Sequence, residues 1–402
     1  MPVHLPVGQL LELAEQFGTP LYVYHADRIA HQYDKLKKAF ESVDARLYYA
    51  CKALSNIHIL SFIRKLGASL DCVSIYEVKL GLMAGFAADD ILFTPNCVDI
   101  EEIKEAKALG VRINIDNISI LEQFGHEFGD SYPVCIRINP HILAGGNMKI
   151  STGHVDSKFG ISIHQLRHIE RVVKSMHINV KGLHMHTGSE IKDIDVFLMG
   201  LDVMLDMATH FPNLEYIDMG SGFKVPYQPG ETETDVQTLG KMVAERMQAF
   251  QQETGRKLQV CFEPGKYLVS QSGYFLVKTN VVKQTPSTVF VGVNSGFNHL
   301  IRPMFYDAYH QIENISNPKG TKRIYTVVGN ICETDTFAWD RSLPEVREGD
   351  ILAFYNAGAY GFEMSSRFNS RPRPAEVMVN KKEVTLIRKR ETIEDLLSNQ
   401  ML

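Results

Sequence analysis

The 402-residue sequence lacks the features that mark several large classes of protein. Its most apolar stretch without a charged side chain, Leu80 to Ala88, is about nine residues long, whereas a membrane helix needs roughly 18 to 20. No basic region precedes an apolar run near Met1, so we expect no signal peptide. The six cysteines are scattered without a CxxC pair, which argues against structural zinc and a disulfide framework and favours a reducing cytoplasm.

An excess of charge of one sign is also lacking. The chain carries 42 Lys and Arg against 47 Asp and Glu, a net charge of −5, so nothing electrostatic favours nucleic acid or an anionic membrane as a partner. Hydrophobic residues make up 45% and charged residues 22%, which is typical of a folded globular chain. The basic run of Lys381, Lys382 and Arg388 to Arg390 is interpreted as a solvated face.

The first two thirds of the chain alternate short strand-like runs with helical patterns. A helix is expected at Asp99–Leu109 with Asp99 as its N-cap, and another at Val196–Phe211. Eight such repeats over about 220 residues predict an α/β fold, a closed (β/α)8 barrel of the TIM type. The strands are expected at Arg46–Cys51, Ser69–Val73, Ile91–Thr94, Val111–Ile115, Val134–Ile138, Gly182–His186, Leu214–Asp218 and Leu258–Phe262.

From about Pro264 the pattern changes, because strand-like runs follow one another without long helices. These runs predict a C-terminal, mostly antiparallel β domain. Leu21–Tyr24 is a further strand with no place in the barrel, and we expect it to join the β domain. The expected domains are therefore a barrel at 26–264 and a β domain at 1–25 and 265–402. The β-domain strands are expected at Gly273–Val282, Val289–Val293, Ile324–Val328, Ile351–Tyr355 and Ala375–Val379.

Functional groups of a parallel barrel collect at the carboxyl ends of its strands. The first strand ends at Lys52, which is either a rim lysine with its head in water or an amine that the chemistry uses. Another ends in His184-Met-His186, where three readings stay open: a metal pair, a ring that packs on a planar ligand, or core histidines. Gly220-Ser-Gly222 is a phosphate cradle or merely a turn. Glu263 is a structural cap, an acid or base, or a partner for a cationic ring nitrogen.

These groups are more informative together than singly. An amine, a ring-stacking surface, an anion site and an acid for a pyridinium are what pyridoxal phosphate requires of a protein. Nine segments then match, in order, those of one enzyme class. The chain resembles the alanine-racemase-barrel class of pyridoxal-phosphate enzymes and, within it, the diaminopimelate decarboxylase family. The segments are Tyr49–Asn56, Lys158–Ile161, His184–Glu190, Asp218–Gly222, Glu263–Lys266, His299–Tyr306, Ile331–Thr334, Asn356–Gly361 and Asn369–Glu376.

The resemblance implies a role for each matching position. Lys52 is implied as the amine that forms the Schiff base, His186 as the ring that stacks on the cofactor, and Glu263 as the partner of the pyridine nitrogen. Cys332 is implied as the proton donor, reaching the site from the partner subunit of a homodimer. The phosphate is expected at Ser189, Gly222, Gly265 and Lys266, and the contacts to substrate or cofactor at Lys266, Arg302, Tyr306, Glu333 and Tyr360.

The activity implied by the resemblance is the decarboxylation of meso-2,6-diaminopimelate to L-lysine and CO₂, the last step of lysine biosynthesis. It implies pyridoxal 5'-phosphate as cofactor, no metal, a homodimer with shared active sites, and β-domain contacts to substrate and partner. The chain departs from the family pattern at Ser221, where a third glycine is usual, and at Lys266, where arginine is usual. An acid is common four residues past the cysteine, but here Asp335 lies at three and Thr336 at four.

Four other interpretations remain at this point. His184-x-His186 fits a metal-dependent hydrolase, which needs further ligands at other strand ends. A racemase of the same class needs two opposed bases, and Glu263 argues against it. Decarboxylases for ornithine, arginine, lysine or carboxynorspermidine share the chemistry, and a non-catalytic pyridoxal-phosphate carrier would bind the cofactor without turnover. The remaining cysteines, Cys51, Cys72, Cys97, Cys135 and Cys261, are interpreted as small buried hydrophobes.

Overall fold

The computed structural model describes residues 4–142 and 156–401. The chain divides into two compact units. The barrel unit comprises Gln32–Val225 and Thr232–Tyr267, and the β unit comprises Met1–His31, Pro226–Glu231 and Leu268–Leu402. The expected absence of a signal peptide concerns the start of the chain, of which residues 1–3 lie outside the described residues.

Eight parallel strands of the described barrel unit close into a ring, as the sequence predicts. Each strand pairs with the next, β5 pairs with β6, and β10 pairs with β2 to complete the circle. A short ninth strand, β7 (Ile161–Ser162), pairs with β6 outside the ring. The ring consists of β2 (Arg46–Ala50), β3 (Ser69–Cys72), β4 (Ile91–Phe93), β5 (Arg112–Ile115), β6 (Val134–Asn139), β8 (Val180–His184), β9 (Tyr216–Asp218) and β10 (Gln259–Phe262).

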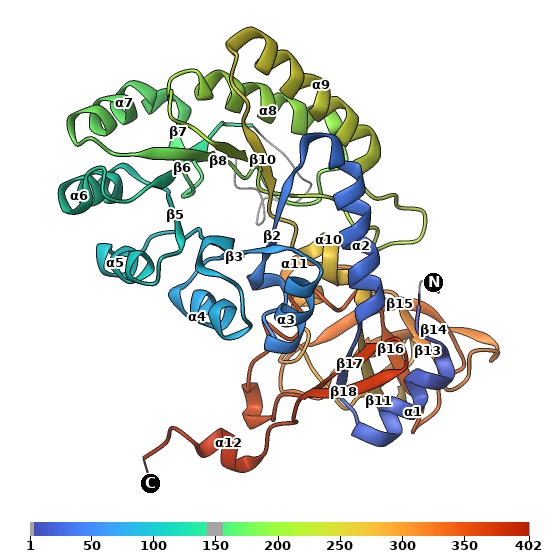
Figure 1. Ribbon diagram of the computed structural model, residues 1–402. Coiled ribbons are helices and arrows are strands. Elements are labelled where there is room, and N and C mark those ends of the chain that lie inside the picture. The colour runs from blue at the N-terminus through green and yellow to red at the C-terminus, as the bar shows by residue number, and fades with distance from the viewer. Residues whose placement is uncertain (1–3, 143–155, 402) are drawn as a thin grey trace. The chain divides into compact units, whose positions relative to one another are not determined.

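Helices α3 to α9 surround these strands (Figure 1). Asp99 caps α5 as predicted, because its carboxylate accepts hydrogen bonds from the N–H groups of Glu101 and Glu102. The helix predicted at Val196–Phe211 is α8, which begins two residues earlier and ends sooner. The helices are α2 (Ala26–Ala39), α3 (Ile57–Lys65), α4 (Ile75–Met83), α5 (Ile100–Ala108), α6 (Ile118–Phe128), α7 (Leu166–Ser175), α8 (Ile194–Ala208) and α9 (Val236–Thr254).

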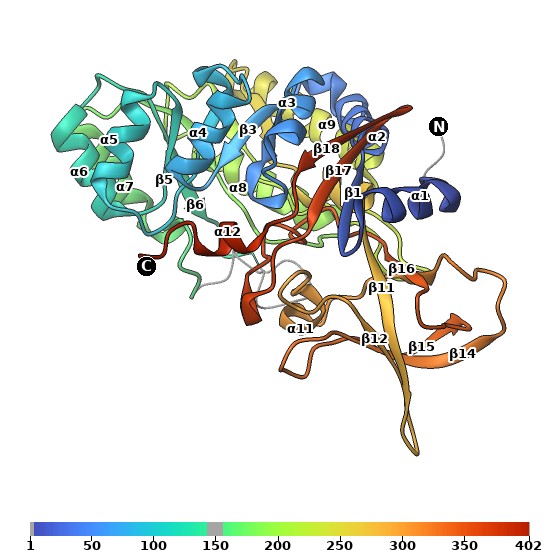
Figure 2. The same ribbon diagram turned by 90° about the horizontal axis from the view of Figure 1, so that it is seen from below.

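The β unit is a mostly antiparallel sheet with the order β15-β14-β12-β11-β1-β17-β18, to which β16 and β13 are added at β11. The long strand β11 runs from β1 to β12, as Figure 2 shows. The strands are β1 (Leu21–His25), β11 (Gly273–Gln284), β12 (Val289–Val293), β13 (Ile312–Asn314), β14 (Lys322–Val328), β15 (Thr336–Pro344), β16 (Ile351–Phe354), β17 (Ala375–Asn380) and β18 (Glu383–Arg388). The helices are α1 (Val7–Phe17), α11 (Arg302–Tyr306) and α12 (Ile393–Leu397), and α10 (Lys266–Val269) leads into the unit.

The predicted place of the N-terminal strand is confirmed, because β1 pairs antiparallel with β11 and parallel with β17. Three strands of the β unit were missed by the sequence prediction, as was the short β7 of the barrel unit. β13 has only three residues, β15 interrupts its apolar residues with Asp340 and Arg341, and β18 has a single buried residue, Ile387. Such edge strands carry little of the alternating pattern on which strand prediction depends.

The interpretation of the basic run as a solvated face is wrong for two of its residues. Arg388 donates a hydrogen bond to the fully buried carboxylate of Glu376. Arg390 donates to the backbone carbonyls of Gly18 and Pro20, and so ties the C-terminal segment to the N-terminal one. These arginines differ from solvated ones only in their contacts with residues distant in the sequence. Such contacts cannot be predicted from the residues next to them.

The cysteines follow the expectation with one exception. Cys51, Cys72, Cys135 and Cys261 are buried, but Cys97 is exposed, contrary to its interpretation as a buried hydrophobe. Cys97 lies in the loop after β4, outside the barrel strands, and has a positive φ of 55°. Within residues 4–142 and 156–401, no helix combines the length and the apolar character needed to cross a membrane.

The close approach of α9 to the end of α2 gives a stability prediction. A Cβ on Gly240 of α9 would lie 1.8 Å from the carbonyl oxygen of Ala39. Gly240→Ala should therefore lower the free energy of unfolding by about 1 to 3 kcal/mol, because the helices must separate. Urea unfolding followed by circular dichroism measures this change.

Gly8→Ala is the matched control, because Gly8 is also helical, is exposed, and has no atom within 4 Å of the place that a Cβ would take. There the same substitution should raise the unfolding free energy by up to about 1 kcal/mol through helix propensity. Equal effects at the two positions would contradict the close approach.

Candidate functional site

Lys52 lies where β2 ends and enters the short 3₁₀ turn η2 (Cys51–Ala53). Its Nζ donates to Oδ2 of Asp71 on the neighbouring strand β3, at 2.9 Å. The Asp71 side chain is completely buried, whereas that of Lys52 is 40% exposed. Burial raises the pKa of Asp71, and the ammonium of Lys52 opposes that shift. The ion pair therefore holds a lysine head at the carboxyl end of the barrel, with its position fixed by a buried acid.

Glu263 follows β10 and is also buried. One oxygen, Oε2, lies 3.2 Å from Nε2 of His184, the last residue of β8. The other oxygen, Oε1, has no hydrogen-bond partner among the described residues. Burial raises the pKa of Glu263, and the positive charges of Lys52 and Arg137 oppose the shift. The carboxyl group is thus rigidly held by one oxygen and has its second oxygen available for a ligand.

A second buried carboxylate, Asp218, ends β9 beside Glu263. Its Oδ1 accepts a hydrogen bond from the N–H of Gly220 at 2.8 Å. Burial, followed by the repulsion from Glu263, raises the pKa of Asp218 well above its usual range. Ligand atoms of His184, Asp218 and Glu263 all lie within 4.8 Å of one another. Two acids this close in a region of low dielectric cannot both ionise cheaply, so they favour a neighbouring cation.

His186 lies just beyond β8, because that strand ends at His184. The strand thus ends two residues before the predicted end at His186, and the two histidines have different partners. The Nδ1 atom of His186 accepts a hydrogen bond from the N–H of Ser221 at 3.3 Å. Burial, with Arg137 and Lys52 nearby, lowers the pKa of His186 well below its usual value. The ring is neutral and held in one orientation.

The turn formed by Gly220, Ser221 and Gly222 requires its glycines. Both have positive φ angles, 61° and 118°, which favour glycine. A Cβ on Gly220 would lie 2.6 Å from the carbonyl oxygen of Met185, and one on Gly222 would lie 2.6 Å from that of Gly188. The turn therefore packs directly against the loop after β8, and a residue with a side chain at either glycine would separate the two.

The remaining barrel candidates lie on the two loops beside this turn. Ser189 is half-buried on the loop between β8 and α8. Lys266, at the start of α10, donates from Nζ to Oε1 of Glu190 at 3.0 Å, next to Ser189. Gly265 lies against the end of β2, where its Cβ would be 3.0 Å from that of Ala50. The structure therefore brings together Lys52, His186, Ser189, Gly222, Glu263, Gly265 and Lys266 at the carboxyl end of the barrel strands.

In the β unit, Cys332 is an exposed residue on the loop between β14 and β15. Asn369 holds it by two hydrogen bonds: its Oδ1 accepts from the N–H of Cys332 at 2.9 Å, and its Nδ2 donates to Sγ at 3.0 Å. Asn369 itself has a positive φ of 56°. The thiol is thus presented at the surface in a defined position.

Arg302 begins α11 and is buried, unlike most arginines. Its guanidinium lies over two tyrosine rings, 5.3 Å from the centre of Tyr227 and 5.9 Å from that of Tyr306. Its Nε has no hydrogen-bond partner among the described residues. An arginine that lies close to two aromatic rings and retains an unused donor is suited to bind an anion.

The other two β-unit candidates lie on loops. Glu333 is exposed beside Cys332. Tyr360 is half-buried and has a positive φ of 58°, a conformation that non-glycine residues rarely adopt and that is enriched at ligand sites.

Sequence reasoning missed several members of these clusters. Asp71 could have been found, because a charged residue in the middle of a run expected to be a buried strand requires a partner. Asp218 carried the same signal. Asn369 and Tyr227 could not have been assigned to Cys332 and Arg302, because they are distant in the sequence and lie in loops.

Comparisons with known proteins agree with this arrangement. Residues 26–270 match the family model described as pyridoxal-dependent decarboxylase, pyridoxal binding domain. The diaminopimelate decarboxylase of Methanothermobacter thermautotrophicus is 38% identical to this chain over 99% of the chain and 95% of its own length. That of Escherichia coli K12 is 35% identical over 99% and 97%. A crystal structure of diaminopimelate decarboxylase from M. jannaschii in co-complex with L-lysine has a TM-score of 0.90 and 32% identity, and the match covers 98% of this chain and 94% of that one.

The buried acid Asp218 gives a pH-dependent stability prediction. The pKa of Asp218 is raised in the folded state, so the folded state holds the proton more tightly than the unfolded state. The stability gained from this proton is fully present below the unfolded pKa of about 3.9 and is lost as the pH rises through the folded pKa. Asp218→Asn removes the charge and retains an oxygen for the N–H of Gly220. The cofactor-free variant should therefore be about 1 to 3 kcal/mol more stable than wild type at pH 7, with a much smaller gain near pH 4. Urea unfolding at both pH values measures this.

Asp202→Asn is the control, because the Asp202 carboxylate is exposed and pairs with Arg246 at 3.0 Å. It should change stability by less than about 0.5 kcal/mol at either pH. If Asp218→Asn proved no more stable than Asp202→Asn at pH 7, the account of a costly buried charge would be wrong.

Proposed function

Because the chain belongs to the diaminopimelate decarboxylase family of pyridoxal-dependent decarboxylases, we propose that it converts meso-2,6-diaminopimelate to L-lysine and CO₂. This reaction is the last step of lysine biosynthesis. The observation that carries the proposal is the convergence at one end of the barrel of a paired lysine, a neutral histidine ring and a buried glutamate. These are the groups that the pyridoxal phosphate chemistry of the family requires.

The described residues fit pyridoxal phosphate. Glu263 offers a buried carboxylate oxygen without a partner, which suits the N–H of a protonated pyridine ring. The turn at Gly220 and Gly222 packs closely against the loop that carries Ser189, which places backbone without side chains beside that hydroxyl, as suits a phosphate. Lys52 offers an amine whose position is fixed by Asp71.

Each barrel residue has a proposed task. Bound pyridoxal phosphate supplies an electron sink for the pair of electrons that CO₂ leaves behind. Glu263 keeps the ring nitrogen protonated, because its negative charge stabilises that cation in a region of low dielectric. His186 presents a flat neutral ring whose orientation is set by the N–H of Ser221. Asp71 stabilises the ammonium form of Lys52 and so acts as a positioning residue for the amine.

The phosphate is proposed to lie at Ser189, Gly222, Gly265 and Lys266. Gly222 and Gly265 supply backbone that a ligand can approach closely, and Ser189 supplies a hydroxyl. Lys266 supplies charge, although its ion pair with Glu190 shares that charge. Lysine lacks the planar fork of arginine, so we expect it to act as a point charge and not as a bidentate clamp.

The β unit is proposed to supply the groups that select the substrate. The distal end of meso-diaminopimelate carries both an ammonium and a carboxylate. Arg302, with its unused Nε, is suited to that carboxylate, and Glu333 to that ammonium. Tyr306, whose ring lies 5.9 Å from the Arg302 guanidinium, and Tyr360 offer further hydroxyl groups. Having both a carboxylate, Glu333, and a guanidinium, Arg302, is the reason we propose a preference for a substrate with two amino-acid ends over ornithine, arginine, lysine or carboxynorspermidine.

Cys332 is proposed to deliver the proton to the α-carbon as a general acid, in the site of the partner subunit of a homodimer. The Cys332 thiol is exposed and is held in position by Asn369, which supports a role in another subunit. The exposed apolar side chains of Ile324 and Trp339 on β14 and β15 offer part of an interface. A reducing cytoplasm is the proposed location, since thiol chemistry at Cys332 requires a reduced cysteine.

The alternatives are less well supported. A metal-dependent hydrolase was suggested by His184 and His186, but these rings have different partners, and the family match is to pyridoxal-dependent enzymes. A racemase benefits from a ring nitrogen that stays neutral, which the acid Glu263 opposes. A non-catalytic carrier would not need the paired acid and base of the β unit.

Lys52→Ala tests the reaction and the amine together. The wild-type protein should release L-lysine and CO₂ from meso-diaminopimelate, and Lys52→Ala should lose the visible absorbance of lysine-bound pyridoxal phosphate and about 10³-fold or more of the turnover. Chiral chromatography of the products and the absorbance spectrum measure both effects.

Lys181→Ala is the control for this pair, because Lys181 forms an ion pair with Glu215 on the barrel surface. It should leave spectrum and turnover unchanged. Faster CO₂ release from ornithine, arginine, lysine or carboxynorspermidine, or formation of the mirror-image amino acid without CO₂, would refute the proposed activity.

The shared active site has its own test. Cys332→Ala should bind pyridoxal phosphate normally yet lose orders of magnitude in turnover. If Cys332 serves the partner's site, mixing Cys332→Ala with Lys52→Ala should restore about a quarter of wild-type activity, because half of the randomly formed dimers are hybrids with one intact site. Turnover after mixed refolding measures this.

Cys97→Ala, which removes the other exposed cysteine, is the control. It should be fully active by itself, and mixing it with Lys52→Ala should give the same turnover as mixing wild type with Lys52→Ala. Near-normal turnover of Cys332→Ala would remove its role as the acid. Loss of turnover without any restoration on mixing would show that Cys332 acts within its own subunit.

A further inference from the structure

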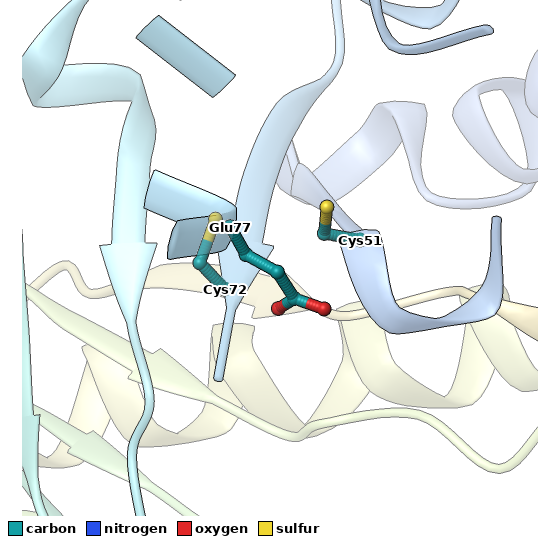
Figure 3. A group of neighbouring side chains, drawn as sticks. All are labelled: Cys51, Cys72 and Glu77. Atoms are coloured by element: carbon teal, nitrogen blue, oxygen red, sulfur yellow. The ribbon is translucent and has the colours of Figure 1, made fainter. Parts of the chain in front are cut away.

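Three donor groups that the proposed reaction does not use lie beside the Lys52–Asp71 ion pair. Cys51 directly precedes Lys52, Cys72 directly follows Asp71, and Glu77 lies in the first turn of α4. The ligand atoms of the three residues all lie within 4.8 Å of one another. Figure 3 shows the cluster, with the Glu77 carboxylate below the two sulfur atoms in that view.

The positions of these donors are fixed by the fold. Cys51 and Cys72 are completely buried, at the ends of the paired strands β2 and β3. The thiol of Cys72 is hydrogen-bonded to Cys51. The Glu77 carboxylate is fixed by the helix start, because its Oε2 accepts from the N–H of Val73 at 2.7 Å while Ser74 Oγ accepts from the N–H of Glu77 at 3.2 Å. Little reorganisation is therefore needed to bring the three donors onto one ion.

The donor types select the ion. Two sulfurs and one oxygen suit a thiophilic divalent cation of the Zn²⁺ class and do not suit Ca²⁺ or Mg²⁺, which take oxygen ligands. Zn²⁺ binds sulfur at about 2.3 Å and carboxylate oxygen at about 2.0 to 2.2 Å, so donors less than about 5 Å apart need only a small contraction. Burial raises the pKa of the Cys72 thiol, with a contribution from Glu77, and a cation would reverse that cost by stabilising the thiolate.

We propose that Cys51, Cys72 and Glu77 form a binding site for a thiophilic divalent cation, and that occupancy inhibits the enzyme. On binding, two S–H bonds break, two metal–sulfur bonds form, and both protons pass to solvent. Cys51 is then fixed to β3 and α4, and the turn that carries Lys52 loses the freedom that repeated attack and release by its amine require. The proposal has a binding half, that the cation binds at these residues, and an inhibition half, that bound cation slows the enzyme. The binding half is independent of the proposed function, whereas the inhibition half rests on it.

Titration of the pyridoxal-phosphate-loaded enzyme with Co²⁺ tests the binding half. We expect one equivalent to produce a sulfur-to-cobalt charge-transfer band that Zn²⁺ abolishes. The double variant Cys51→Ser/Cys72→Ser should lose the band, whereas Cys97→Ser should retain it. Exposed Cys332 is present in all three proteins, so it cannot produce the difference. Glu77→Gln should retain the band but need about tenfold more Co²⁺, a loss of about 1.4 kcal/mol.

Turnover in the presence of Zn²⁺ tests the inhibition half. Wild type and Cys97→Ser should be inhibited reversibly, with recovery on adding a chelator, and the double variant should need at least about tenfold more Zn²⁺. The absence of a band in wild type, or an equal band in the double variant, would overturn the site. A band without inhibition would overturn the link to Lys52. If the double variant does not fold, the band in wild type and its weakening in Glu77→Gln decide the binding half.

Discussion

The structure depends on one constraint: the closed parallel barrel places the ends of β2, β3, β8, β9 and β10 around one buried region of low dielectric. Those ends carry Lys52, Asp71, His184, Asp218 and Glu263, which are the groups that such a region tolerates least. The barrel keeps them by pairing lysine with aspartate and histidine with glutamate. The cluster holds three acids, Asp71, Asp218 and Glu263, and fewer positively charged groups. A cationic ligand therefore stabilises it.

The excess of buried acids over positively charged groups affects how the site can bind a cationic ligand. A carboxylate that is costly to bury stabilises a protonated ring nitrogen strongly, because no water competes for it. The same burial that raises the pKa of Glu263 is therefore a reason to propose it as the partner of the pyridine nitrogen. The glycine turn beside it follows from the same closure, since β8 and β9 are adjacent and their loops pass so close that a Cβ on Gly220 or Gly222 would lie 2.6 Å from a carbonyl oxygen of the β8 loop. Binding of cofactor and stability of the barrel are consequently linked.

Much of this could be predicted from the sequence, because local patterns determine it. All eight barrel strands were predicted, since each is a short β-branched or aromatic run between helical patterns. The positions of Lys52 and Glu263 just after β2 and β10 followed from the same runs. Which residues pair with each other could not be predicted. The contacts of Asp71 with Lys52, of Asn369 with Cys332 and of Arg390 with the carbonyl of Pro20 join residues 19, 37 and 370 positions apart. The exposed position of Cys97 was mispredicted for the same reason, because only the folded chain determines which loops face solvent.

The central claim is that Lys52 is the residue that carries the cofactor. Borohydride reduction of the pyridoxal-phosphate-loaded protein fixes that bond permanently, and peptide mapping by mass spectrometry locates it. The account predicts one modified peptide, containing Tyr49 to Asn56, with the added mass on Lys52. A label on Lys266 or on any other lysine, or no label at all, would contradict it.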